Sequence, residues 1–194
     1  MVKYSTMTGK LKGIDALNSN PLTNTFCQSM GKNPANICHD CYSCAMLHTS
    51  RQNCIPRFEN NGIELSRGLM DTFPGIQTPL FRINAHGELL NVNHTRNIIR
   101  LARANPNTTI VLWTKRPNLV YRALDLENGL PDNIVLVYSS KRINVVEKLP
   151  RLFHHVFTVY NYYNYQINCG RKSCLDCQLC YSRDTEVYIN ELLK

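Results

Sequence analysis

Two tandem C-x-x-C-x-x-C motifs lie near the two ends of the chain, and each has one more cysteine upstream. The N-terminal cysteine set is Cys27, Cys38, Cys41 and Cys44, and the C-terminal cysteine set is Cys169, Cys174, Cys177 and Cys180. Thiolates at this spacing converge on one point if the backbone turns around it, and they bind zinc or an iron–sulfur cluster. These cysteines are therefore predicted metal ligands.

The tandem spacing also bears on the identity of the metal. Zinc sites with four cysteines usually combine two separated C-x-x-C pairs, whereas three cysteines in tandem are typical of [4Fe–4S] clusters. We therefore expect one or two iron–sulfur clusters, with zinc as the alternative metal. His39, inside the first motif, could hydrogen-bond to a ligand thiolate. The remaining cysteine, Cys54, is interpreted as a small buried hydrophobic residue.

The composition is that of a globular protein in a reducing compartment. The chain has 194 residues, 43% of them hydrophobic, which suits one domain with its own core. It has neither an apolar run long enough for a membrane span nor an apolar N-terminal leader, so we expect a cytoplasmic protein without a membrane partner. An odd number of cysteines, nine, fits complete disulfide pairing poorly.

The chain carries a formal charge of +8. Four thiolates around a doubly charged metal core leave about −2 per site, so two filled sites would reduce the net charge to about +4. This excess permits a nucleic-acid partner without requiring one. Arg96, Arg100 and Arg103 share one face of a predicted helix, and we interpret them as surface charges.

Short apolar runs alternate with helical segments from residue 78 onward. Strands are predicted at 80–83, 110–113, 134–138 and 156–160, and helices at 95–104 and 117–126, with a helical turn at 145–149. Outside this region we expect a strand at 14–17, a helix at 42–51 and a short helix from Thr185 onward. Strand starts 20–30 residues apart are typical of parallel β/α units.

These elements predict an α/β fold. Four or five strands are too few for a closed eight-stranded barrel, so the expectation is an open sheet or a partial TIM-like barrel. We treat 1–194 as a single domain with three parts. They are an N-terminal cysteine loop at 27–54, a β/α core at 78–160 and a C-terminal cysteine-rich segment at 166–194.

Polar residues follow the predicted strands at their carboxyl ends, where parallel sheets place their ligands. The candidate ligand-binding residues are Asn84, His86, Gly87, Glu88, Lys115 and Ser139. Glu88 suits a ligand ammonium, and Lys115 suits a carboxylate or phosphate. The alternative is that Glu88 and Lys115 pair with each other across neighbouring strand ends.

Several segments together resemble the phage gene-product-88 domain family. They are Cys38-x-x-Cys41-Tyr42, the runs at 81–88 and 112–117, and the terminal motif that ends in Cys180-Tyr181. The family is similar in turn to radical S-adenosylmethionine proteins. This resemblance implies a partial β/α barrel, a three-cysteine [4Fe–4S] cluster and S-adenosylmethionine as a cofactor, with Gly87-Glu88 similar to the motif that holds its amino group.

The first cysteine motif departs from the radical-enzyme pattern C-x-x-x-C-x-x-C, because position 37 is Ile37. If Cys27 or Cys44 supplies a fourth thiolate, no iron stays open for the cofactor. Two functions follow. One is an iron–sulfur protein with redox or radical chemistry on a small molecule, in the host cytoplasm if phage-encoded. The other is a non-catalytic metal-stabilised module that binds nucleic acid or a protein. A pocket at the strand ends favours the first.

Overall fold

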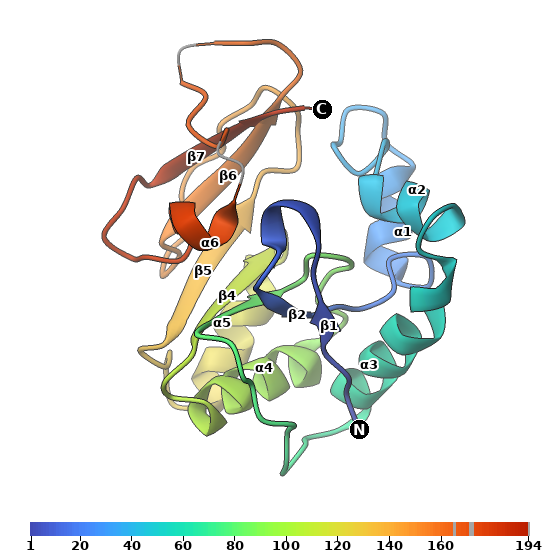
Figure 1. Ribbon diagram of the computed structural model, residues 1–194, viewed down its shortest axis with the longest axis vertical. Coiled ribbons are helices and arrows are strands. Elements are labelled where there is room, and N and C mark those ends of the chain that lie inside the picture. Colours follow the sequence, from blue (N-terminus) through green and yellow to red (C-terminus); the bar gives the residue numbers. More distant parts are fainter. Residues whose placement is uncertain (165, 171–172, 194) are drawn as a thin grey trace.

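The computed structural model describes residues 1–164, 166–170 and 173–193, and these form a mixed α/β structure around one sheet (Figure 1). The described part contributes seven strands, which lie side by side in chain order. They are β1 (Ser5–Thr6), β2 (Asp15–Leu17), β3 (Leu80–Ile83), β4 (Thr109–Thr114), β5 (Ile134–Ser139), β6 (His155–Tyr160) and β7 (Tyr188–Leu192). The strands β2 to β7 are parallel, and β1 is antiparallel to β2.

Three of the α-helices in the described ranges begin at a side chain that accepts hydrogen bonds from free backbone N–H groups. The α-helices of these ranges are α1 (Thr25–Gly31), α2 (Tyr42–His48), α3 (Ile55–Arg67), α4 (Val92–Ala104), α5 (Pro117–Leu126) and α6 (Cys174–Cys177). The side chains of Asn24, Asn91 and Ser173 accept backbone hydrogen bonds at the starts of α1, α4 and α6. Pro117 opens α5, where its fixed φ suits the first turn. Two short 3₁₀ helices, η1 (Gly9–Leu11) and η2 (Gln52–Cys54), complete the fold.

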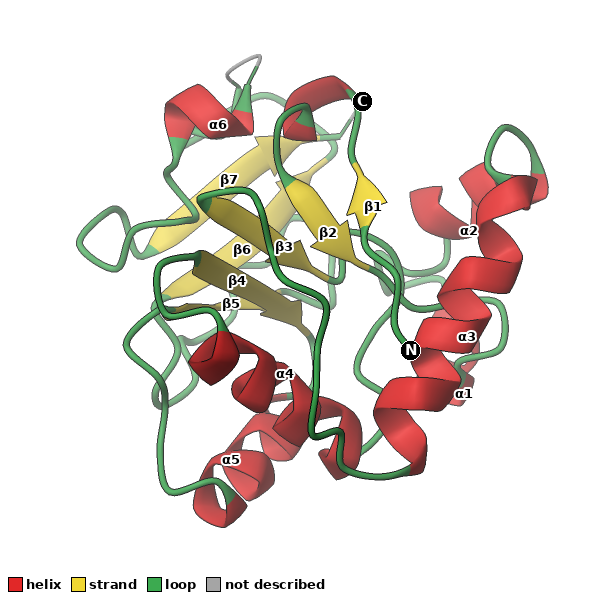
Figure 2. Ribbon diagram, turned by 60° about the horizontal axis from the view of Figure 1, so that its bottom comes forward, coloured by secondary structure: helices red, strands yellow, loops and turns green. Residues whose placement is uncertain are grey.

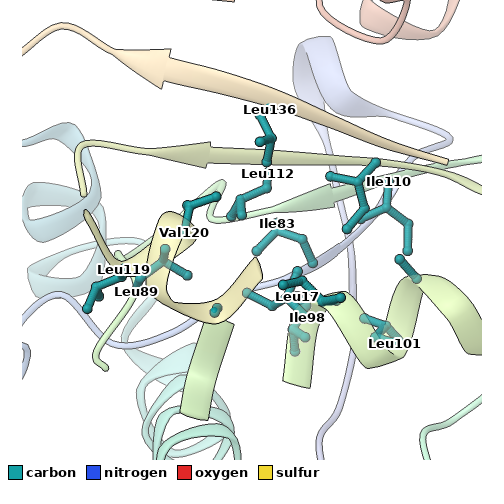
Figure 3. Packing of buried hydrophobic residues seen from close by; sticks show 14 of the residues in the cluster. Leu17, Ile83, Leu89, Ile98, Leu101, Ile110, Leu112, Leu119, Val120 and Leu136 are labelled. Atoms are coloured by element: carbon teal, nitrogen blue, oxygen red, sulfur yellow. The ribbon is translucent and has the colours of Figure 1, made fainter. Parts of the chain in front are cut away.

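One face of the sheet packs against the helices, and Figure 2 shows α4 and α5 beneath the strands. Alternate strand residues, such as Ile83 and Leu112, point to this face and meet Ile98 and Leu101 of α4 and Val120 of α5 (Figure 3). These side chains are almost completely buried. Burial of an aliphatic side chain stabilises a fold by about 1.5–3 kcal/mol, so this face is a self-sufficient core.

The opposite face packs against the C-terminal cysteine-rich segment instead of a layer of long helices. Its buried strand residues include Val111, Val137 and Ile189, and Leu175, Leu179 and several cysteines pack against them. Figure 2 shows the short helix α6 on this side of the sheet. The second core is smaller, and thiols form part of its boundary.

Most of the predicted elements are confirmed. The strands expected at 14–17, 80–83, 110–113, 134–138 and 156–160 are β2 to β6, and the helices expected at 42–51, 95–104 and 117–126 are α2, α4 and α5. An α/β fold with an open, mostly parallel sheet is therefore confirmed.

Two predicted elements were wrong. The segment after Thr185 forms β7 and not a helix, because Tyr188–Leu192 adds to the edge of the sheet beside β6. Residues 145–149 form no helix. The sequence reading also missed α3, although Ile55, Phe58 and Leu65 have helical spacing and Phe58 and Leu65 are buried. None of the helices in the described ranges is long and apolar enough to cross a membrane.

Candidate functional site

All eight predicted metal-ligand cysteines line one cavity of about 550 Å³. The two sets are more than 120 residues apart in the sequence, yet both border the space between the strand ends and the C-terminal segment. Cys54 does not line this cavity. It is partly exposed at the end of η2, where its thiol donates to Asn53 Oδ1 at 3.6 Å. The expectation that Cys54 is buried was therefore wrong.

The N-terminal set sits on α1, on α2 and in the loop between them. Asn24 caps α1 and donates from Nδ2 to the carbonyl of Glu88 at 2.9 Å, which fixes Cys27 beside the end of β3. The loop is tied to the segment after β5, since Ile37 N–H donates to the carbonyl of Lys141 at 2.8 Å. These bonds place the set at the carboxyl ends of the strands.

The C-terminal set is held over the sheet face by a second group of bonds. Ser173 caps α6, and the Cys169 N–H donates to the carbonyl of Asn190 at 2.9 Å, next to β7. Thr185 Oγ1 donates to the carbonyl of Leu179 at 2.6 Å and closes the loop after the motif. The set is thus anchored to the last strand.

The thiols of each set lie near enough to affect one another. Burial raises the pKa of Cys44 to about 12, and the neighbouring thiol of Cys41 adds to the shift. Burial likewise raises the pKa of Cys169 to about 11 and that of Cys180 to about 12, the latter opposed by the Arg82 guanidinium. Without a metal these thiols are protonated, and a metal that binds them must displace the protons.

Five of the six predicted ligand-binding residues line the same cavity, namely Asn84, Gly87, Glu88, Lys115 and Ser139. His86 is absent from the cavity wall. Its side chain is buried, and its Nδ1 lies 2.8 Å from the hydroxyl of Ser43 on α2. His86 therefore joins α2 to the end of β3 and does not meet a ligand in the cavity.

Gly87 allows the chain to pass close to Ser19. It has a φ of +84°, and a Cβ at this position would lie 2.3 Å from the carbonyl oxygen of Ser19. Only glycine fits this combination of backbone angle and contact. The turn delivers the side chain of Glu88 to the end of β4.

Glu88 is a buried carboxylate that connects two strand ends. Oε1 accepts from Thr114 Oγ1 at 2.6 Å and from its neighbour Leu89 N–H at 2.8 Å, while Oε2 accepts from the Lys115 N–H at 2.7 Å. Burial raises the pKa of Glu88, and the Lys115 charge and these bonds oppose the rise. The residue therefore has a structural role in addition to any contact with a ligand.

The predicted pairing of Glu88 and Lys115 is made through the backbone of Lys115. The Lys115 ammonium instead donates to Ser139 Oγ at 2.8 Å, one strand farther along. In the described ranges no ion pair joins the two side chains. Thr114, Lys115 and Ser139 thus link the ends of β4 and β5 into one polar rim.

A second pocket of about 520 Å³ also borders the N-terminal set. All four cysteines of the set line it, together with His39, Asp40 and His48. The Nδ1 atom of His39 lies 3.0 Å from the carbonyl oxygen of Gly31, so in this structure the ring holds the loop and not a thiol. The N-terminal set therefore contributes to the linings of both pockets.

No three His, Cys, Asp or Glu side chains among the described residues form a group that could hold a metal ion as they are placed. The residues nevertheless supply the right donors, because each set offers four thiols on one cavity wall. The donor chemistry fits a thiolate-bound metal group. The thiols must approach one another when it binds.

The predicted arginine stripe on α4 is partly engaged in the fold. Arg96 and Arg103 form ion pairs with Glu127 at 2.8 and 3.0 Å, and Arg100 lies 3.8 Å from it. Glu127 is only 8% exposed. The three arginines hold the end of α5 against α4, which leaves less of their charge for nucleic acid.

Arg82, Trp113 and Tyr181 are among the cavity residues that sequence reasoning missed. The Arg82 guanidinium stacks over the Trp113 ring, 3.7 Å from its centroid. The arginine within the apolar strand β3 was a sequence signal of this site, because a charged side chain is rarely placed on a buried sheet face without a partner. Tyr181, directly after the last cysteine, is 5% exposed.

The fold and the site together define a class, an α/β protein whose parallel strands end at a cavity lined by two cysteine sets. The family model described as Gene product 88 matches residues 71–179, which is more than half of the chain. The chain therefore belongs to the gene product 88 family. The match spans β3 to α6 and leaves the N-terminal set outside. Neither a curated protein nor a solved structure matches the chain.

Proposed function

We propose that the protein is an iron–sulfur redox protein, in which each cysteine set holds a [4Fe–4S] cluster beside a small-molecule cavity. The observation that carries the proposal is the cavity of about 550 Å³ bordered by all eight cysteines. Its volume falls in the range of about 300–1,000 Å³ that is usual for small-molecule sites.

The cavity supports the first of the two functions that the sequence left open. A metal-stabilised module needs metal sites that fasten the chain termini, and it needs no internal space beside them. An enzyme needs a space where a ligand meets the metal group. The parallel strands end at such a space, and Glu88, Lys115 and Ser139 border it. This arrangement supports catalysis.

The choice of iron–sulfur over zinc rests on donor chemistry and spacing. Zinc draws its four ligands to about 2.3 Å from a single ion. A [4Fe–4S] cluster binds each thiolate at a different iron, so its ligands surround a larger body. Two tandem three-cysteine motifs on the walls of a wide cavity suit the larger body better.

S-adenosylmethionine as a cofactor is a finer proposal, and two features limit it. Cys27 and Cys44 line the cavity beside Cys38 and Cys41, so a fourth thiolate is at hand for the cluster. Glu88, the expected partner of the cofactor's ammonium, already accepts three hydrogen bonds from the protein. We therefore propose electron transfer as the main chemistry and radical chemistry as its variant.

The protein's own residues would perform two tasks in this reaction. Apolar side chains such as Phe26 and Phe157 exclude water from the cavity. Lys115, held by Ser139, supplies a positive charge at the strand ends. The clusters would supply the electrons.

The parallel strands follow one another in chain order and carry helices on one face. This arrangement further supports the proposal of a partial β/α barrel with the cavity on its inner side.

The first test is an anaerobic purification with iron, sulfide and zinc assays and an absorption spectrum. We expect a brown protein with iron and sulfide in equal amounts and a broad absorption band in the visible range. A colourless protein that holds stoichiometric zinc would overturn the iron–sulfur proposal.

A titration with S-adenosylmethionine, followed by electron paramagnetic resonance of the reduced protein, tests the finer proposal. If an iron is open to the cofactor, the spectrum shifts in the wild type, and the shift weakens in Glu88→Gln. An unchanged spectrum removes the cofactor and leaves electron transfer as the proposed chemistry.

A further inference from the structure

Buried polar atoms without a hydrogen-bond partner gather at the cavity. Seven such side-chain atoms occur in the described ranges, and four belong to residues that line this one space: Arg82 Nε, Asn84 Oδ1, Trp113 Nε1 and Tyr181 OH. A buried polar group without a partner costs about 1–3 kcal/mol. The concentration of this cost at one cavity favours a ligand that completes the bonds, and because the atoms themselves are shielded from solvent, the cavity wall must shift slightly to admit it.

Three of the four atoms can donate, and they come from neighbouring elements. Arg82 lies on β3, in register with Val111 of β4, and Trp113 follows two residues later on the same strand face. The guanidinium lies over the indole ring at 3.7 Å from its centroid, so its N–H edge stays available in the plane of the group.

Apart from any metal group at the cysteines, the charged side chains around the cavity favour a single negative charge on the ligand. The ammonium of Lys10 forms an ion pair with Glu191, and that of Lys115 donates to Ser139. Arg82 makes no ion pair with a carboxylate in the described ranges. Glu88 and Glu191 also border the cavity, and their charge would repel a phosphate dianion. A carboxylate matches the planar guanidinium edge.

The remaining residues of the cavity wall indicate the polarity of the rest of the ligand. Leu11, Phe26, Ile37, Phe157 and Val159 give the cavity a largely apolar surface. We propose that the cavity binds a small monoanionic carboxylate with an apolar body. Its carboxylate accepts from Arg82, Trp113 Nε1 and Tyr181 OH, and Asn84 Oδ1 accepts from an N–H or O–H group of the ligand. This inference names the ligand class of the proposed redox site, but it depends only on the cavity.

The experiment is a calorimetric titration of the anaerobically purified full chain, with iron measured in the same sample. The probes are mandelate, phenylacetate and hexanoate, of which mandelate also carries a hydroxyl for Asn84 Oδ1, with phenylacetamide and phenyl phosphate for comparison. We expect saturable binding of at least one carboxylate, at least tenfold tighter than phenylacetamide and phenyl phosphate. Trp113 is the only tryptophan in the chain, so its fluorescence should change in parallel.

Arg82→Gln should weaken carboxylate binding at least tenfold, because the bidentate charged contact is lost. Arg122→Gln is the matched control, since this exposed arginine of α5 does not line the cavity. Circular dichroism checks the fold of each variant. If Arg82→Gln does not fold, Tyr181→Phe and Arg82→Lys carry the test, each with an expected loss of about threefold or more.

Three results would overturn the proposal: no saturable binding of any carboxylate, equal binding of phenylacetate and phenylacetamide, or unchanged binding in the Arg82 variants. If the last result came with an altered cluster spectrum, Arg82 would serve only as the counter-charge of the thiolates. The iron content of the sample reports on the redox proposal separately, because carboxylate binding to a protein without iron would sustain this inference while the cluster proposal failed.

Discussion

The two faces of the sheet are covered in different ways. On one face, α3, α4 and α5 pack a continuous apolar core against the strands. On the other face, a smaller apolar cluster adjoins cysteines, and a cavity of about 550 Å³ remains. The first face has the larger apolar core. The second has less apolar area, and we propose that ligand bonds at the cysteines add to its stability.

The two faces therefore have different roles, because one forms the main core and the other carries the candidate site. The helix face fixes the strands and, with them, the positions of their carboxyl ends. The cysteine segments attach to those ends through a few backbone bonds, such as those of Ile37 and Cys169. A site attached in this way can rearrange around a metal group without disturbing the core.

The largest expected effect is at the C-terminal set. Cys177→Ser would remove one ligand from the proposed metal site, and a structural metal site contributes on the order of 10 kcal/mol to folding. We expect rapid proteolysis of 166–193 in the variant, while the β/α core stays intact. Limited proteolysis with mass spectrometry measures this. Cys54→Ser is the matched control, because Cys54 lies outside the cavity, and equal resistance of the Cys177→Ser and wild-type proteins would contradict the expectation.

A substitution in the core of the helix face should lower the stability of the whole fold. Leu112 is 1% exposed and packs in the helix-side core. Leu112→Ala should lower the free energy of unfolding by about 3 kcal/mol, within the usual range for buried leucines. Urea unfolding followed by circular dichroism measures the loss, which should be the same with and without metal. A loss that appears only in the metal-free protein would mean that the two faces are not independent.

Acid should weaken the helix face through His94. Burial, together with the Arg116 charge, lowers the pKa of His94 to about 3 in the folded protein. Below about pH 6.5 His94 binds a proton in the unfolded chain but stays neutral in the folded protein. The free energy of unfolding therefore falls as the pH drops from about 6.5 to about 3. At pH 5 the expected cost is about 2 kcal/mol relative to pH 7.

Unfolding by urea at pH 5 and pH 7 measures this cost, and His94→Gln should reduce the difference by about 2 kcal/mol. Because Gln does not titrate in this range, a variant that keeps the full pH dependence would assign the effect to other groups. His86 and His154, whose pKa values burial lowers to about 4, are the next candidates.

The smallest expected effect concerns Glu88, which bonds to the polar rim at the ends of β4 and β5. Glu88→Gln keeps the size of the side chain but loses one acceptor oxygen for the bonds to Thr114, Lys115 and Leu89. We expect a loss of about 1 kcal/mol in the free energy of unfolding. Asn161→Asp, near the end of β6 and exposed, should change it by less than about 0.5 kcal/mol. Equal effects would remove the structural role of Glu88.

The sequence was most informative where periodicity and apolar runs decide the structure. The strands β3 to β6 and the helices α4 and α5 follow from local patterns that the tertiary structure reinforces. The strand β7 could not be predicted in this way, because polar Asn190 and Glu191 interrupt its pattern and pairing with β6 supplies the missing preference.

The candidate site was likewise predicted only where local sequence carries the signal. Cysteine spacing identified both sets, and the strand-end rule identified Glu88 and Lys115. That both sets border one cavity depends on long-range packing, which spacing does not encode. Arg82 and Trp113 were missed because their importance comes from a cross-strand stack that exists only in the folded sheet.

The central claim is that the two sets bind separate clusters on one cavity. It is tested most directly by iron and sulfide assays on anaerobically prepared wild type and on two double variants, Cys38→Ser/Cys41→Ser and Cys174→Ser/Cys177→Ser. With about four irons per cluster, each variant should keep about half of the wild-type iron and sulfide. Loss of all iron in either variant would mean a single shared cluster, and zinc without sulfide in all three proteins would contradict the claim altogether.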